Sequence, residues 1–494
     1  MAMQRVLPVT HELALFDIAR TRALEQRAAA SLPAGALMAR AGEAAARLAL
    51  AIAPHARRVW VAAGPGNNGG DGLEAACHLQ RWGKDVAVSL IGDAAALPAD
   101  ARGALARAQA AGVRIGGETM RAPDLALDAL LGIGASRAPQ GEIEAAIRHL
   151  NALPCPVLAI DLPSGLQADT GLALGDACVT AAHTLTMLTL KPGLFTASGR
   201  DHAGVVWLDQ LGTESAADAP QAWLSGNGTP QARRHAQHKG SFGDVAIVGG
   251  GPGMSGAALL AARAAHAAGA GRVFVEMLED GAMSLDALRP ELMFRRGWTH
   301  SAPAVLGAST VVCGCGGGDA VRAPLPRLLS LAKRLVLDAD ALNALASDAA
   351  LVPLLRARAG RGLASVMTPH PLEAARLLGS TTSEVQADRL HAAQELAARY
   401  LCVVVLKGSG SVIAAPDQTP RINSTGNAAL ATAGTGDVLA GWLGGRWAQI
   451  GSGDEPAEAF AVAVQAVAEH GAAAEPQPSG ALLAGDLIER LHRR

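Results

Sequence analysis

The sequence predicts an α/β protein of two three-layer αβα domains, the first with a Rossmann-like doubly wound sheet. Three observations lead to this prediction. The chain has 494 residues, and at roughly 150 residues per domain this corresponds to about three small domains or two large ones. Short β-rich runs alternate with helical patterns in two series, which is typical of mostly parallel sheets covered by helices. Between the series, residues 211–239 lose this periodicity and indicate a linker.

The first domain is expected over residues 1–215 and the linker over 216–238. Apolar residues three and four apart predict helices over 13–52, broken at Pro33 and Pro54. The β-rich runs predict strands at 59–62, 86–91, 125–131, 157–160, 184–190 and 205–208.

The second domain is expected over residues 239–494. Its sequence repeats the same alternation of β-rich and helical segments, which again indicates a mostly parallel sheet. The predicted strands are 244–248, 273–277, 310–313, 334–337, 364–367 and 402–406.

The composition excludes a basic surface for nucleic acid or an anionic membrane. The 42 Lys and Arg residues nearly balance the 44 Asp and Glu residues, which gives a formal charge of -2. The sequence contains no run of about 18 uncharged apolar residues, and its first residues fit neither a secretory signal nor an anchor. We therefore expect partners that are small molecules, with no nucleic acid and no membrane.

Six scattered cysteines favour reduced thiols and hence a cytoplasmic location. Cys313 and Cys315 are the one close pair, and because no second Cys/His pair lies nearby we interpret them as small residues of a glycine loop. His235 and His238 in the linker stand beside basic residues without a carboxylate, which argues against metal binding there.

A glycine-rich run, AAGPGNNGGDG over residues 62–72, follows the first strand and precedes a helix predicted over 73–81. Its backbone amides can form an anion-binding nest at a helix N-terminus. Asp128 and Asp161 end two later strands, and Ser164 follows the second of them. Since ligands of open α/β sheets bind beyond the carboxyl ends of the strands, we expect these groups to share one crevice. Either aspartate is alternatively a helix cap.

The motifs GPGNNGGDG, DALLGIG, DLPSG and KPGL occur in this order and resemble the NAD(P)H-hydrate epimerase family over residues 1–211. The resemblance implies a K+ ion at Asn68, Asp128 and Ser164. It also implies substrate contacts at Asn67, Asn68, Gly69, Gly70, Asp71, Gly132, Ile133, Gly134, Ala135, Ser136, Arg137, Ala138 and Asp161. Glu74 replaces the small apolar residue that is usual in this family.

The second domain begins with a glycine pattern that also fits a dinucleotide fingerprint. Gly251, Gly253 and Gly256 match G-x-G-x-x-G after a strand, and Glu276 lies twenty residues further on. A dehydrogenase would also need a site for a hydride-transfer substrate, and we identify none in the sequence. This pattern is therefore a weak argument for hydride transfer.

A second glycine loop, within NSTGNAALATAGTGDVLAG, places Gly436 and Asp437 just before an apolar helix. Free amides there would stabilise a transferring phosphoryl group, and Asp437 would accept the proton of a substrate hydroxyl. The alternative is that Asp437 only caps the helix. Further candidates at strand ends are Asp338 and Asp340, and His370, which stands between two prolines in a rigid loop or a plain surface turn.

The segments HKGSFGDVAIVGG, LDADALN, TPHPLEAARLL, LKGSGSVI and NSTGNAALATAGTGDVLAG resemble, in order, the ADP-dependent NAD(P)H-hydrate dehydratase family, which has a ribokinase-like fold. The resemblance covers residue 231 to the C-terminus. It implies nucleotide contacts at Lys407, Gly408, Ser409, Gly410, Ser411 and Gly436. It implies contacts with the hydrate at Ala257, Gly318, His370 and Asp437. This chain departs from the family pattern at Cys315, Leu372 and Ser411.

Together the two resemblances imply a bifunctional repair enzyme for hydrated nicotinamide cofactors. We expect its substrates to be NADHX and NADPHX, with ADP as co-substrate, K+ in the first domain and Mg2+ in the second. Asp161 and Asp437 are the expected catalytic residues, and we expect a homo-oligomer. Two alternatives stay open: a ribokinase-like small-molecule kinase, which would release a stable phosphorylated product, and a non-catalytic nicotinamide-nucleotide-binding protein.

Overall fold

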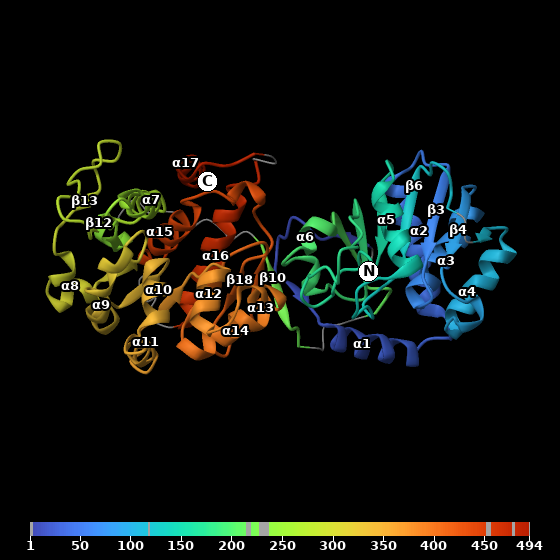
Figure 1. Ribbon diagram of the computed structural model, residues 1–494, viewed down its shortest axis with the longest axis horizontal. Coiled ribbons are helices and arrows are strands. Elements are labelled where there is room, and N and C mark those ends of the chain that lie inside the picture. Colours follow the sequence, from blue (N-terminus) through green and yellow to red (C-terminus); the bar gives the residue numbers. More distant parts are fainter. Residues whose placement is uncertain are drawn as a thin grey trace. The chain divides into compact units, whose positions relative to one another are not determined.

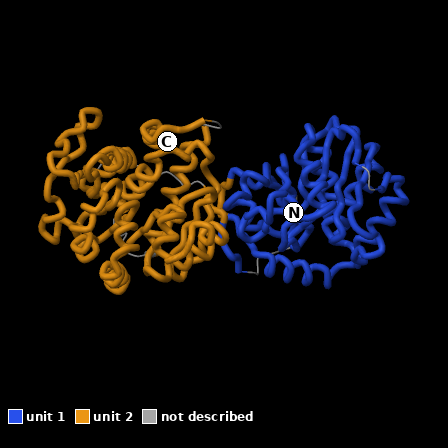
Figure 2. The backbone as a smooth tube through the Cα atoms, in the orientation of Figure 1, with its two compact units in different colours: residues 1–8, 13–223 blue, residues 9–12, 224–494 orange. Residues whose placement is uncertain are grey.

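A computed structural model describes residues 3–116, 119–213, 219–226, 237–450, 456–476 and 480–493. The chain divides into two compact units, which have different colours in Figure 2. Unit 1 comprises residues 1–8 and 13–223, and unit 2 comprises residues 9–12 and 224–494. Across the described residues, no helix combines the length and the apolar character that crossing a membrane requires.

The described residues of unit 1 form an eight-stranded sheet in the order β1-β9-β8-β7-β6-β3-β4-β5. All neighbours are parallel except β1 and β9. The strands are β1 (Gln4–Arg5), β3 (Arg58–Ala63), β4 (Asp85–Leu90), β5 (Arg114–Gly116), β6 (Leu125–Ala129), β7 (Val157–Ile160), β8 (His183–Met187) and β9 (Val205–Asp209). Figure 1 labels α2 to α6 around these strands. The helices are α1 (Ile18–Ala30), α2 (Ala36–Ile52), α3 (Asn67–Arg81), α4 (Ala99–Ala110), α5 (Gly141–Ala152) and α6 (Gly199–His202).

Helices cover both faces of this sheet because alternate strand residues are apolar on each face. Val59 and Val61 of β3 belong to a core shared with α2, α3 and α4. Trp60 and Ala62 face the other way, into a core that includes Ile147 of α5. These two cores produce the predicted three-layer arrangement.

Unit 2 has a second mixed sheet, in which β13-β12-β11-β14-β15-β16-β17 are parallel and β18 and β19 continue antiparallel. The strands are β11 (Asp244–Gly249), β12 (Arg272–Met277), β13 (Met293–Phe294), β14 (Ser309–Cys313), β15 (Arg334–Leu337), β16 (Ser365–Met367), β17 (Val403–Leu406), β18 (Val412–Ala414) and β19 (Arg421–Asn423). The helices are α7 (Ser255–Ala267), α8 (Pro303–Gly307), α9 (Leu325–Leu331), α10 (Asp340–Ser347), α11 (Leu351–Ala359), α12 (Pro371–Leu378), α13 (Thr382–Ala387), α14 (Arg389–Tyr400), α15 (Thr435–Ala448), α16 (Pro456–Ala472) and α17 (Ala484–His492).

One face of the unit 2 sheet contributes Val245, Val312 and Val336 to a core with α7, α15, α16 and α17. The alternate residues Val311 and Leu335 are fully buried but lie outside this core, so the other face is covered as well. Helices on both faces of a mainly parallel sheet confirm the predicted class of the second domain.

Several predicted elements differ from the observed ones. Residues 13–15 form a strand, β2 (Leu13–Leu15), and not the start of a helix, and β10 (Ala222–Ser225) lies inside the segment predicted as linker. α3 begins at Asn67, six residues before the predicted start, so the glycine-rich run forms its first turns. Close packing overrides the low helix propensity of glycine here, because a side chain at Gly69 would meet the Gly64 carbonyl oxygen at 1.9 Å.

Candidate functional site

A cavity of about 590 Å3 lies at the carboxyl ends of the central strands of unit 1. The register aligns Asp128 of β6 with Ala62 of β3 and Ala159 of β7, so the segments after these three strands meet at one edge. The lining comes from these segments, from the segment after β8, and from α1 and α2. Its polar residues include Arg22, Glu25, Asn67, Asn68, Asp71, Asp161 and Lys191.

Asp161 is fixed at the end of β7 in a strained conformation. Its φ of 68° is unusual for a residue other than glycine, and its N–H donates to the Leu185 carbonyl oxygen at 2.7 Å. Asp161 Oδ1 accepts from Lys191 Nζ at 2.6 Å, and Oδ2 accepts from the Ile133 N–H at 3.2 Å. Because the side chain also lines the cavity, a substrate group there would contact a carboxylate of defined orientation.

Two more carboxyl groups face Asp161. Burial, and then the charge of Asp161, raise the pKa of Asp71 well above its ordinary value. The same two causes, in the same order, raise the pKa of Glu25 on α1. Both side chains line the cavity, so it contains carboxyl groups that favour the protonated form beside Asp161.

Two of the three predicted K+ ligands, Asp128 and Ser164, are in direct contact, and the third, Asn68, lines the cavity. Asp128 is fully buried and accepts from Ser164 twice, from the N–H at 2.8 Å and from Oγ at 2.6 Å. Burial raises its pKa to about 6, although these hydrogen bonds act in the opposite direction. Ser164 Oγ also accepts from the Leu131 N–H at 2.9 Å. Asn68 lies near the residue after Leu131, because a Cβ placed on Gly132 would be 3.5 Å from Asn68 Cγ.

Asn68 supplies the observation that tests a cation here. Its side-chain Oδ1 and Nδ2 are both buried and have no hydrogen-bond partner among the residues that the structure describes. Such groups carry a free-energy cost unless a ligand or water satisfies them. An amide oxygen, a serine hydroxyl and a carboxylate are oxygen donors of the kind that a hard cation uses, so these residue types fit the predicted K+.

The cavity brings together part of the predicted contact set. Asn67, Asn68, Asp71 and Asp161 line it, as do residues 132–135. Gly69 and Gly70 are buried in packing, and Ser136, Arg137 and Ala138 are exposed outside the lining. Glu74, the departure from the family pattern, is buried and forms an ion pair with Arg107 at 2.8 Å, so its charge is satisfied within unit 1.

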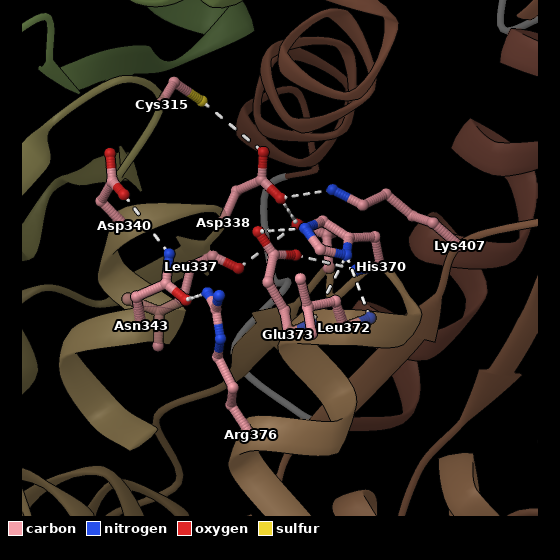
Figure 3. A network of polar contacts seen from close by, with 11 residues as sticks. Cys315, Leu337, Asp338, Asp340, Asn343, His370, Leu372, Glu373, Arg376 and Lys407 are labelled. Carbon is pink, nitrogen blue, oxygen red and sulfur yellow. Dashed lines mark hydrogen bonds and ion pairs between the residues drawn. The ribbon is translucent and has the colours of Figure 1, made fainter. Parts of the chain in front are cut away.

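The second candidate site lies at the carboxyl edge of the unit 2 sheet. Asp338, directly after β15, is 1% exposed, and its Oδ1 accepts from Lys407 Nζ at 2.8 Å and from Thr368 Oγ1 at 2.7 Å. Its Oδ2 faces Cys315 Sγ at 3.9 Å. Figure 3 shows the side chains of Cys315 and Lys407 directed toward Asp338 from opposite sides. The next residue, Ala339, has a φ of 47°, a strained backbone that opens α10.

Asp437 lies in the first turn of α15, not before it as predicted. A carboxylate oxygen of Asp437 lies within 4.8 Å of a carboxylate oxygen of Asp338 and of Cys315 Sγ. Burial, followed by the charge of Asp338, raises the pKa of Asp437 to about 6. A carboxylate with this pKa is a competent proton acceptor near neutral pH. A Cβ on its neighbour Gly436 would lie 3.3 Å from Lys407 Nζ, which places that ammonium beside the same helix N-terminus.

His370 lies in a rigid turn at the start of a helix, and its ring is partly exposed. It is the N-cap of α12: its Nδ1 accepts from the Leu372 N–H at 3.1 Å, and Glu373 Oε2 accepts from the His370 N–H at 2.8 Å. Its Nε2 lies 3.2 Å from Glu373 Oε1, and the ring is 44% exposed. His370 is therefore a structural cap whose ring remains accessible to a ligand. Figure 3 shows it between Glu373 and the Asp338–Lys407 pair.

The predicted nucleotide segment forms a loop after β17. Gly408 and Gly410 have positive φ angles, and Ser411 Oγ donates to the Gly408 carbonyl oxygen at 3.1 Å. Buried Arg389 donates to the carbonyl oxygens of Leu406 and Lys407 at 3.2 Å, which braces the loop from behind. Ser409 lies in the same loop, between Gly408 and Gly410.

The remaining predicted residues lie around the loop that follows β14. The Gly318 N–H donates to Asp340 Oδ2 at 2.8 Å, and a Cβ on Gly316 would lie 2.9 Å from Ala257 Cβ. The Gly251 N–H donates to the Gly316 carbonyl oxygen, so the apparent dinucleotide fingerprint instead pairs two glycine loops. Buried Glu276 accepts from the Thr299 N–H, a structural role.

Some site residues carry no strong signal in the sequence. Glu25 and Arg22 belong to a helix without a motif, and Lys191 is part of the KPGL motif, which by itself indicates no contact with Asp161. Cys315 was interpreted as a small loop residue, yet it lies beside two carboxylates. His238 caps a short 3-10 helix, accepting from the Gly240 N–H at 3.1 Å, and His235 lies outside the described residues.

Comparisons with known proteins assign a family to each unit. A model described as NAD(P)H-hydrate dehydratase matches residues 245–493, and one described as YjeF-related protein N-terminus matches residues 34–193. A solved structure of the ADP/ATP-dependent NAD(P)H-hydrate dehydratase of Bacillus subtilis is 29% identical, with a TM-score of 0.42, and covers 54% of this chain and 93% of that chain.

Relatives match over nearly the whole chain. The bifunctional NAD(P)H-hydrate repair enzyme of Escherichia coli is 38% identical over 92% of this chain and 88% of its own length. That of Leishmania braziliensis is 39% identical over 88% of this chain and 85% of its own. These matches confirm the resemblance predicted from the sequence motifs. The chain therefore belongs to the family of bifunctional NAD(P)H-hydrate repair enzymes.

Proposed function

We propose that this chain repairs hydrated NADH and NADPH in two steps. Unit 1 interconverts the R and S epimers, and unit 2 dehydrates the S epimer to NAD(P)H with ADP, which yields AMP and phosphate. The observation that carries the proposal is that each unit places an ionisable carboxylate, Asp161 or Asp437, among polar groups at the carboxyl edge of its sheet. Two sites in one chain allow both epimers to be recovered.

In unit 2, Asp437 is the base that removes the proton of the substrate hydroxyl. The hydroxyl oxygen then attacks the β-phosphorus of ADP, and AMP leaves. The phosphoryl group converts the hydroxyl into phosphate, which departs with its bonding electrons as the carbon–carbon double bond of the nicotinamide ring forms and the adjacent carbon loses a proton. Lys407 and the N-terminus of α15 stabilise the negative charge on the transferred group.

The roles of the other unit 2 residues follow from their positions. Ala257, Gly318 and the exposed ring of His370 contact the hydrate, and the loop of Lys407, Gly408, Ser409, Gly410 and Ser411, with Gly436, contacts the nucleotide. Mg2+ would arrive bound mainly to phosphate oxygens and water. This fits the described residues, where the convergent set of metal donors includes a thiol, which Mg2+ disfavours.

In unit 1, Asp161 moves the proton during reversible opening of the hydrate, and Lys191 orients its carboxylate. Asn67, Asp71 and residues 132–135 surround the substrate. A K+ ion held by Asn68, Asp128 and Ser164 would neutralise the buried Asp128 charge and fix the loops beside the substrate. The orphaned Asn68 oxygen supports this assignment.

We also propose a cytoplasmic homo-oligomer. All six cysteines are free thiols, which supports a reducing compartment. Size-exclusion chromatography with light scattering measures the oligomeric state.

The proposal is tested with each purified epimer separately. The S epimer with ADP is expected to give NADH, AMP and phosphate in equal amounts, and the R epimer without nucleotide is expected to give the S epimer. A stable phosphorylated product would instead support a ribokinase-like kinase. Tight binding without turnover of either epimer would support a nucleotide-binding protein.

A further inference from the structure

A thiol and two carboxylates converge in unit 2 from three separate elements. Cys315 lies in the loop after β14, Asp338 at the end of β15 and Asp437 in the first turn of α15. Cys315 Sγ and one oxygen of each carboxylate all lie within 4.8 Å of one another. Within residues 3–493, excluding the undescribed segments, this is the one group of three such ligands that converges in this way.

Hydrogen bonds link the members of this group to one another and to their neighbours. Asp338 is almost fully buried, and its Oδ1 is bound by Lys407 and Thr368. Its Oδ2 accepts a long hydrogen bond from the Cys315 thiol at 3.9 Å, whose proton a bound cation would displace. Figure 3 shows the Cys315 side chain directed at this oxygen. The sulfur, this oxygen and the Asp437 carboxylate therefore lie close enough to one another to bind a single ion.

The spacing suits a four-coordinate cation. Zn2+ binds thiolate sulfur at about 2.3 Å and carboxylate oxygen at about 2.0–2.2 Å, which puts tetrahedral ligand atoms about 3.5 Å apart. The sulfur and the two carboxylate oxygens are at most 4.8 Å apart, so side-chain movements of about 1 Å would bring them to this spacing. A thiolate selects borderline and soft cations over Mg2+.

We propose that Cys315, Asp338 and Asp437 form a binding site for a thiophilic divalent cation of the Zn2+ or Cd2+ class. When the cation binds, a sulfur–metal bond forms, the thiol proton passes to solvent, and no group is oxidised or reduced. A water or substrate oxygen occupies the fourth position. The Lys407 ammonium stays beside Asp338 and offsets part of the negative charge of the ligands.

Such a cation would inhibit dehydration, a consequence that rests on the proposed function of unit 2. A carboxylate bound to metal cannot accept the substrate proton, so Asp437 would be blocked. Unit 1 would keep its activity because its carboxylates belong to a different site. The site would thus make one of the two repair steps sensitive to thiophilic metals.

Binding is tested by titrating the full-length, metal-free protein with Cd2+ and recording the ultraviolet charge-transfer absorbance of cadmium thiolate. We expect one equivalent to saturate the band in the parent. The variants Cys315→Ser and Cys315→Ala should lose the band and bind at least tenfold more weakly. The matched control is Cys313→Ala, which removes a buried thiol two residues away that is outside the group, and it should keep the band.

A band that persists in both Cys315 variants would overturn the site. Circular dichroism and the epimerase rate of each variant show whether it is folded, and Cys315→Ser keeps nearly the volume of the parent side chain. Inhibition is then measured on Zn2+-loaded protein after free metal is removed, relative to the metal-free rate of the same variant. We expect dehydration to fall at least tenfold in the parent, to recover with a chelator, and to change less than twofold in Cys315→Ala. Binding at Cys315 without inhibition would support the site and count against Asp437 as the base.

Discussion

Lys191 Nζ lies 2.6 Å from Asp161 Oδ1 at the unit 1 cavity, and each side chain holds the other in place. Lys191 is 1% exposed and also donates to Thr186 Oγ1 at 2.9 Å and to the Met187 carbonyl oxygen at 2.8 Å. Its ammonium is therefore fixed by three acceptors around the end of β8. This fixed donor holds the Asp161 carboxylate in one orientation, and the Asp161 side chain lines the cavity.

Breaking this pair should destabilise unit 1. Lys191→Met leaves Asp161 charged without its partner, and the loss of one member of a buried pair costs about 3–5 kcal/mol. The double variant Asp161→Asn with Lys191→Met should recover part of that loss, because neither charge then remains. Unfolding of both variants is followed by calorimetry. Additive effects of the two substitutions would show that the pair is not coupled.

Removing the Asp161 charge should abolish one activity only. We expect Asp161→Asn to slow epimerisation by about 10²–10⁴-fold, the usual contribution of a positioned acid or base. Dehydration of the pure S epimer should be unchanged, since that site lies in unit 2. Chiral chromatography of the R epimer after incubation without nucleotide measures the rate. Epimerisation at the parental rate would remove Asp161 from the mechanism.

The reciprocal variant is Asp437→Asn, which keeps the shape of the side chain but cannot accept a proton. Dehydration of the S epimer with ADP should fall by about 10²–10⁴-fold. Epimerisation provides the internal control for folding and concentration. A variant that dehydrates at the parental rate would exclude Asp437 as the base.

Dehydration should depend on pH through Asp437. Burial raises the pKa of this carboxyl to about 6, and only the ionised form accepts a proton. We therefore expect kcat/KM to fall about tenfold per pH unit below 6 and to level off above it. The measurement is the initial rate with the S epimer across pH 5–8. A rate that stays constant down to pH 5 would exclude a base with this pKa.

Potassium should stabilise unit 1 through Asp128. The pKa of Asp128 is raised to about 6 from 3.8, so the native state binds the proton more tightly than the unfolded chain. The Asp128 carboxyl therefore stabilises the native state at acidic pH, and this contribution is lost as the pH rises through 6. The loss in the free energy of unfolding is on the order of 3 kcal/mol. A bound K+ stabilises the ionised carboxylate and opposes this loss.

We therefore expect KCl, relative to LiCl, to raise the unfolding temperature of the parent more at pH 8 than at pH 5. Asp128→Asn removes the charge and should remove the difference between the salts. Scanning calorimetry of both proteins at the two pH values makes the comparison. An equal K+ effect in the variant would place the cation elsewhere.

The central strands could be predicted because their sequences alone require burial. The apolar run 157–160 was predicted as a strand and is β7 (Val157–Ile160), in the interior of the sheet. The short strands β18 and β19 were not predicted, because three residues carry too little periodicity. The start of α3 at Asn67 was not predicted because glycine disfavours helices, whereas the close approach to Gly64 leaves no room for a side chain at Gly69.

The candidate sites could be predicted in part. Asp161, Asp128 and Asp437 end strands or begin helices, so local sequence places them at the sheet edge. Pairings over long distances in the sequence could not be predicted: Asp338 meets Lys407 across 69 residues. Glu25 approaches Asp161 only because α1 lines the cavity. Cys315 was missed as a possible ligand because its two carboxylate neighbours come from other elements.

The central claim is that one chain recovers both epimers and needs ADP to do so. The most direct test mixes the full-length protein with equal amounts of both epimers of hydrated NADH and follows the reduced-nicotinamide absorbance with ADP, with ATP and without nucleotide. We predict complete recovery of both epimers with ADP only, and none with ATP or without nucleotide. Recovery that stops at half would show that unit 1 does not epimerise, and no recovery with either nucleotide would contradict the account of unit 2.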